Sequence, residues 1–208
     1  MGTGRARSVA VWCAAWTCAL LIVAGAQTSP GSADQVIVKF APESEAGQVL
    51  SRMDLAAVTD PAGDAQLAAI ARDLGERIGM PLSLESLTSG RELLLALDRE
   101  ALLSTLAEHL RQRDDVARVE VESVEALRLV VTFEPDGTFA DMVASGPRLA
   151  LGAGEIEAEV LSAERGRAVL ALDSDALMSS LLARLEADPA VQYAQPNLRL
   201  RPYAGGSG

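Results

Sequence analysis

The segment Leu95-Ala96-Leu97-Asp98, followed by Glu100-Ala101-Leu102-Leu103-Ser104, occurs again as Leu170-Ala171-Leu172-Asp173, followed by Asp175-Ala176-Leu177-Met178-Ser179. A second pair keeps the same order. Val36-Ile37-Val38-Lys39-Phe40 is stopped by Pro42, and Leu129-Val130-Val131-Thr132-Phe133 is stopped by Pro135. Two matches in the same order indicate an internal repeat. We therefore expect two related units, over residues 35–127 and 128–203.

The first unit alternates strand and helix signals. The β-branched run at 36–40 predicts an opening strand, and segments 82–87 and 93–97, joined by a turn at Ser89-Gly90, predict a β-hairpin. Apolar residues at helical spacing predict one helix over 64–78, ended by Gly79, and another from the N-cap Asp98 to Arg111. A closing strand over 116–124 completes the order β-α-β-β-α-β.

The second unit repeats this order in shortened form. A hairpin is expected from 155–163 and 167–172 around Arg165-Gly166, then a helix over 174–187 and a strand over 191–194. The spacing from Phe133 to Leu170 is 18 residues shorter than that from Phe40 to Leu95, so only residues 139–143 remain for the first helix. The sequence predicts an α+β protein with two tandem ferredoxin-like (βαββαβ) domains, each an antiparallel sheet with helices on one face, and the second copy abbreviated.

The junction between the two units, and the residues that precede their helices, give two further predictions. Leu127-Arg128 joins the closing strand of one unit to the opening strand of the next with almost no linker, so the two units should be rigidly related. Asp173 precedes a helix at the place equivalent to Asp98, and both are expected to act as N-caps.

Composition excludes several functions. The chain has 29 acidic and 18 basic side chains, a formal charge of −11, which argues against nucleic-acid binding. A Ser-His-Asp site would have to use His109, the only histidine, and a Cys/His zinc site cannot be assembled. Gly152-Ala153-Gly154 precedes a hairpin and not a phosphate-binding helix. We expect no catalytic activity, no metal and no organic cofactor, and His109 to be a solvated helix residue.

The N-terminus has the pattern of a secretory signal peptide over 1–26. Arg5 and Arg7 precede an apolar run over 9–23 and the small residues Ala24-Gly25-Ala26. The alternative is a membrane anchor, but about 15 apolar residues are fewer than the roughly 20 that a spanning helix needs. Residues 27–34 are typical of a linker, and both cysteines lie in the leader. We expect an exported, periplasmic or extracellular protein with no membrane partner after cleavage.

Two segments carry a family resemblance. Val-Ile-Val-Lys-Phe-x-Pro at 36–42 and Asp-Pro-Ala-Val-Gln-Tyr-Ala-Gln-Pro-Asn at 188–197 resemble the opening and closing strands of the propeptides of subtilisin-like serine proteases. Each repeat resembles one such domain, although the first closes with Val-Ala-Arg-Val-Glu-Val-Glu at 116–122, without Pro-Asn. Stand-alone relatives of these propeptides act as protease inhibitors. Because these residues include no catalytic domain with its triad, the resemblance implies an inhibitor or folding chaperone of a subtilisin-like protease.

The resemblance also implies where the protease would bind. Such propeptides leave their C-terminal residues in the substrate groove, and Leu200-Arg201-Pro202-Tyr203 fits, with Tyr203 in the primary pocket and Leu200 in the deeper one. The sheet of such propeptides packs on two surface helices of the enzyme, where Glu164 on the second hairpin is a candidate to cap exposed N–H groups. We therefore expect binding through the sheet of the second unit and the tail behind it, with residues 204–208 flexible.

Less specific interpretations of the tail, of the paired carboxylates and of the function remain open. The tail is alternatively a structureless terminus. The carboxylate pairs Glu120/Glu122 and Glu157/Glu159 are either a solvated face or an acidic rim that meets a partner. The alternative function is a non-catalytic protein-interaction or ligand-binding module that retains the fold without protease inhibition.

Overall fold

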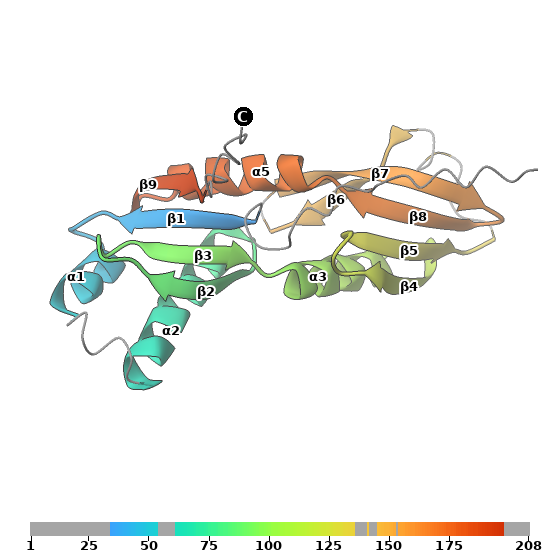
Figure 1. Ribbon diagram of the computed structural model, residues 1–208. Helices are drawn as coiled ribbons and strands as arrows, with labels where there is room; N and C mark the ends of the chain where they lie inside the picture. Colours follow the sequence, from blue (N-terminus) through green and yellow to red (C-terminus); the bar gives the residue numbers. More distant parts are fainter. Residues whose placement is uncertain (1–33, 54–60, 136–140, 142–144, 153, 198–208) are drawn as a thin grey trace, which may run out of the picture.

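The computed structural model is an α+β protein with two antiparallel sheets (Figure 1). It describes residues 34–53, 61–135, 141, 145–152 and 154–197. Segments 1–26 and 198–208, most of the linker and all but one of residues 139–143 lie outside the described residues. Within the described ranges no helix is long and apolar enough to cross a membrane. The elements are β1 (Gln35–Phe40), α1 (Glu45–Arg52), α2 (Pro61–Ile78), β2 (Leu82–Leu87), β3 (Leu93–Leu97), α3 (Arg99–Arg111), β4 (Val116–Ser123), β5 (Arg128–Phe133), β6 (Arg148–Leu151), β7 (Gly154–Glu164), β8 (Arg167–Leu172), α5 (Ser174–Ala187) and β9 (Val191–Pro196).

Local signals place most of these elements where the sequence predicts them. The β2–β3 hairpin and α5 have the expected bounds, and β7 and β8 pair around Arg165-Gly166. Asp98 caps α3 by accepting a 2.9 Å hydrogen bond from the Ala101 N–H, and Asp173 caps α5 by accepting two at 2.8 Å. Two short elements were not anticipated: α1, which Ser44 caps through the Gly47 N–H, and β6.

The two sheets exchange strands between the halves of the chain. One sheet has the order β2-β3-β1-β9 and the other β4-β5-β8-β7-β6. The closing strand of the first repeat, β4, therefore lies beside β5, and the closing strand of the second repeat, β9, lies beside β1. Neither repeat forms a sheet from its own strands alone, which the sequence analysis did not anticipate.

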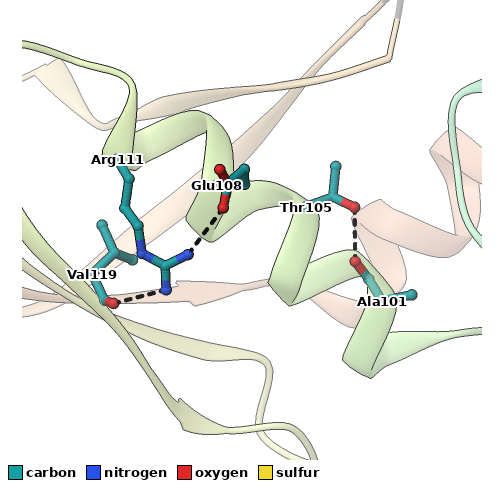
Figure 2. A network of polar contacts seen from close by, with 5 residues as sticks. All are labelled: Ala101, Thr105, Glu108, Arg111 and Val119. Atoms are coloured by element: carbon teal, nitrogen blue, oxygen red, sulfur yellow. Dashed lines mark hydrogen bonds and ion pairs between the residues drawn. The ribbon is translucent and has the colours of Figure 1, made fainter.

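Each closing strand lies in the same lobe as the helix that precedes it in the chain. Helix α3 packs on β4, β5 and β6, and α5 packs on β9. Arg111 of α3 donates a 3.1 Å hydrogen bond to the Val119 carbonyl of β4 and lies 3.4 Å from Glu108 (Figure 2). We call β1, α1, α2, β2, β3, α5 and β9 lobe A, and α3 with β4–β8 lobe B. Lobe B is thus one continuous segment, 99–172, inserted between the two parts of lobe A.

The short connection between β4 and β5 accounts for the exchange. Only residues 124–127 separate the two strands, and they form a tight turn in which the Leu127 N–H bonds to the Val124 carbonyl at 3.3 Å. Strands joined by so short a loop pair as an antiparallel hairpin. Since β4 occupies the edge of the lobe B sheet beside β5, the edge of β1 is left for β9.

The two lobes share one hydrophobic core and touch through their backbones. Nearly all the buried residues of both sheets belong to a single cluster. Arg184 of α5 donates hydrogen bonds to the carbonyls of Ile78 and Leu151, both at 3.0 Å, and so joins the end of α2 to β6. Gly152 packs so closely on Gly79 that a Cβ added to it would lie 2.5 Å from the Gly79 Cα.

Candidate protein-docking face

One face of the lobe A sheet is not part of the core. Along β1, Val36, Val38 and Phe40 are at most 3% exposed, whereas the alternating residues between them are only half-buried. Strand pairing places their neighbours from β2, β3 and β9 on the same side. We call this side the open face, which consists of Gln35, Ile37, Lys39, Ser83, Ser86, Leu94, Ala96, Tyr193 and Gln195.

The open face carries few charges. Within this set Lys39 is the only ionisable residue besides Tyr193, and two carboxylates adjoin it: Glu92, which accepts a hydrogen bond from Tyr193, and the exposed Glu85, between Ser83 and Ser86 on β2. The corresponding side of the lobe B sheet has more charged residues, Arg118, Glu120, Arg128, Glu159, Glu164 and Arg167, beside the uncharged Val130, Thr132, Val169 and Ala171. The centres of protein–protein interfaces are depleted of charged residues. The open face of lobe A is therefore the sheet surface that best suits docking on another protein.

A polar cluster closes one end of the open face. Tyr193 donates a hydrogen bond to Glu92, whose other oxygen accepts one from Thr88 at 3.1 Å. The Tyr193 hydroxyl holds the pKa of Glu92 below its ordinary value, with smaller contributions from Thr88 and Lys39, and against partial desolvation. Lys39 also donates to the Gly90 carbonyl. The one positive charge on the open face is thus held beside a carboxylate.

Tyr193 is the best candidate for an interface anchor. Its side chain is 38% exposed, although it lies directly opposite Lys39 in the β1–β9 pair. Tyrosine is enriched among the residues that carry binding energy, because it adds apolar area and a hydrogen-bonding group with few rotatable bonds. The sequence does not single out Tyr193, because nothing local to β9 indicates that it lies beside β1.

Of the expected site residues the structure describes only Glu164. Leu200, Arg201, Pro202 and Tyr203 lie outside the described residues. Glu164 is exposed at the tip of the β7–β8 hairpin in lobe B, where it pairs with Arg167. The tail, in contrast, follows Asn197, whose backbone N–H donates a 2.9 Å hydrogen bond to the Gln35 carbonyl in lobe A. The sheet that precedes the tail is therefore that of lobe A and not that of the second repeat.

His109 and one member of each carboxylate pair have partners in the structure. His109 is exposed on α3, and its Nδ1 lies 3.1 Å from the Ala150 carbonyl of β6. Glu120 pairs with Arg118, and Glu157 lies 3.6 Å from Arg148. In the part of the chain that the structure describes, no group of three or more His, Cys, Asp or Glu side chains is arranged to hold a metal ion.

No family model, curated protein or solved structure matches the chain. Its function has to be inferred from its residues and from the geometry of the open face.

Proposed function

We propose that this chain is an exported, non-catalytic protein that binds a subtilisin-like serine protease through the open face of lobe A, as an inhibitor or a folding chaperone. The observation that carries the proposal is the open face with few charges and the exposed Tyr193, on a strongly acidic protein. A partner that covers this face would bury Ile37, Leu94 and the tyrosine ring without desolvating an unpaired charge.

The exchange of strands supports the same proposal. The two segments that resemble protease propeptides, 36–42 and 188–197, are far apart in sequence but contribute neighbouring strands, β1 and β9. The order β2-β3-β1-β9 corresponds to that of one βαββαβ unit in which β9 is the closing strand. We infer that each lobe is a ferredoxin-like unit that borrows its closing helix and strand from the other repeat.

The tail is the second part of the proposed binding mode. Residues 198–203 follow directly after Asn197, which lies beside Gln35 at the edge of lobe A. The open face would dock on the enzyme, and Leu200-Arg201-Pro202-Tyr203 would enter its substrate groove. Glu164 belongs to lobe B and takes no part in this mode, so a Glu164→Gln variant should inhibit as well as the wild type.

The open face can be tested with a matched pair of charge substitutions. The protein over 27–208 should slow a subtilisin-type protease acting on a chromogenic peptide. Ile37→Arg places a charge on the open face, and Val169→Arg places one at a comparable half-buried position on the corresponding side of the lobe B sheet. We expect Ile37→Arg to weaken inhibition at least tenfold, about 1.4 kcal/mol, and Val169→Arg to leave it unchanged, with both folds checked by circular dichroism.

Two results would overturn the proposal. One is no effect of micromolar wild-type protein on several subtilisin-type proteases, either on their activity or on the yield of their refolding. The other is equal inhibition by the two arginine variants. In the first case the open face would instead favour a protein-interaction module that retains the fold without protease inhibition.

The tail is tested separately by deletion. Removing residues 198–208 should weaken inhibition at least tenfold and leave the melting temperature nearly unchanged, because the described fold ends at Asn197. Equal inhibition by the truncated and full-length proteins would exclude the tail and leave the open face as the whole site.

A further inference from the structure

A groove lies between α2 and β2, the edge strand of lobe A. At its closed end α2 touches the start of β2 through Gly75, where an added Cβ would lie 2.8 Å from the Met80 carbonyl oxygen. Towards the N-terminus of α2 the helix diverges from the sheet (Figure 1). The divergence leaves a groove of about 560 Å³ between Asp64, Leu67 and Ala68 of α2 and the whole of β2, 82–87.

The walls of the groove leave apolar surface uncovered. Leu84 and Leu87 pack against the core but are only half-buried, whereas Leu82, at the closed end, is 8% exposed. The opposite wall contains the small, exposed Ala68. The groove is therefore apolar at its base and open to an entering side chain.

The backbone of β2 offers hydrogen-bonding groups along the same groove. Among the described strands β2 pairs with β3 alone and forms one edge of its sheet. An edge strand presents outward N–H and C=O groups that an added strand can pair with. Of the other edges, β4 carries three charged residues and two register shifts, β6 has only four residues, and β9 ends at Pro196, which has no N–H to donate. Each of these features hinders strand addition, whereas β2 has a single register shift, between Leu84 and Ser86.

The charges of the groove select the partner. Its lining contains two acidic residues, Asp64 and Glu85, and no basic one. We propose that the groove binds an extended polypeptide segment by strand addition to β2, and that this segment alternates apolar with basic residues. Its apolar side chains would cover Leu84 and Leu87, and its arginine or lysine side chains would meet the two carboxylates.

We propose that the segment comes from another polypeptide, because the C-terminal tail of the same chain does not supply it. Asn197 follows β9, at the opposite edge of the sheet from β2. Crossing to the outer side of β2 spans four strand spacings, about 19 Å, which takes about six extended residues. That distance would use up 198–203, and the remaining Ala-Gly-Gly-Ser-Gly has no large apolar or basic side chain.

The test uses a fluorescently labelled peptide of sequence Leu-Arg-Leu-Arg-Leu and the protein over 27–208. We expect saturable binding, loss of at least tenfold in affinity when both arginines of the peptide are replaced by glutamate, and a similar loss in Asp64→Lys. Ala68→Trp fills the groove and should abolish binding. Ala65→Trp is its matched control, because Ala65 is an exposed alanine on the same helix that does not line the groove, and it should bind normally.

Amide NMR locates the peptide. Binding should shift the signals of 82–87 and slow the exchange of the outward amides of β2. No binding at millimolar peptide, equal binding by the two tryptophan variants, or shifts confined to β1 and β9 would each overturn the proposal. Because Ala68 lies on α2 and is not part of the open face, Ala68→Trp should inhibit the protease as well as the wild type, and failure of either proposal leaves the other standing.

Discussion

Replacing Gly152 with alanine should destabilise the protein by an amount that can be worked out from two features of the backbone. Gly152 has a φ of +57°, in the left-handed region, where a residue with a Cβ costs about 1–2 kcal/mol. The added Cβ would also lie 2.5 Å from the Gly79 Cα and 2.9 Å from the Gly79 oxygen. These are backbone atoms that cannot rotate away, and forcing such a shift costs about 1–3 kcal/mol.

We therefore expect Gly152→Ala to lower the free energy of unfolding by about 2–5 kcal/mol, measured by urea denaturation followed by far-ultraviolet circular dichroism. Gly146→Ala is the control, because Gly146 has a φ of +72° but no atom within 4 Å of an added Cβ. It should lose only the backbone contribution, about 1–2 kcal/mol. Equal losses in the two variants would refute the close contact between the lobes at Gly152 and Gly79.

Three further substitutions test individual interactions. Asp173→Ala removes the N-cap of α5 and should lower the free energy of unfolding by about 0.5–2 kcal/mol in urea denaturation. Ser174→Ala, at the next residue, is the control and should lower it less. Equal losses in the two variants would argue against the cap. Tyr193→Phe should raise the pKa of Glu92 in an NMR titration, because the tyrosine hydroxyl is the main cause of its lowering. The pKa of Glu92 in the folded protein lies below its ordinary value of 4.5. The hydrogen bond between Tyr193 and Glu92 therefore stabilises the fold above pH 4.5, and this stabilisation is lost as the pH falls through the folded pKa. An unchanged pKa of Glu92 in Tyr193→Phe would contradict the hydrogen bond. Arg184→Met removes the side chain that donates hydrogen bonds to carbonyls of both lobes, and it should lower the free energy of unfolding by about 1–3 kcal/mol. Stability equal to that of the wild type would show that water replaces the arginine at these carbonyls.

The elements that the sequence predicted depend on neighbours in the chain. Asp98 and Asp173 cap helices through N–H groups two or three residues ahead, and the β2–β3 and β7–β8 hairpins form between adjacent segments. Helix α1 escaped prediction because its eight residues are too few for a clear helical period. Strand β6 escaped because its four residues pair with the start of a β7 strand that is longer than the sequence indicated.

The candidate site could not be predicted from the sequence in the same way, because its position depends on which strands become neighbours in the sheet. A repeat in the sequence favours two units that each close on themselves, and under that assumption Glu164 and the tail would share a sheet. The structure instead places β9, with Tyr193, beside Lys39 of β1. The open face is therefore made of residues that the sequence analysis assigned to different repeats.

The amino-acid sequence by itself determined the α+β class, the internal repeat and most helix and strand positions, because periodicity and caps act within a few residues. Only the tertiary structure decided which strand closes which sheet. The turn over 124–127 makes β4 the hairpin partner of β5, because closing a short loop costs less chain entropy than returning β4 to β1 across the first repeat. The pairing of β1 with β9 follows as the remaining way to cover the free edge of β1, and with it the open face and the position of Asn197, where the tail begins.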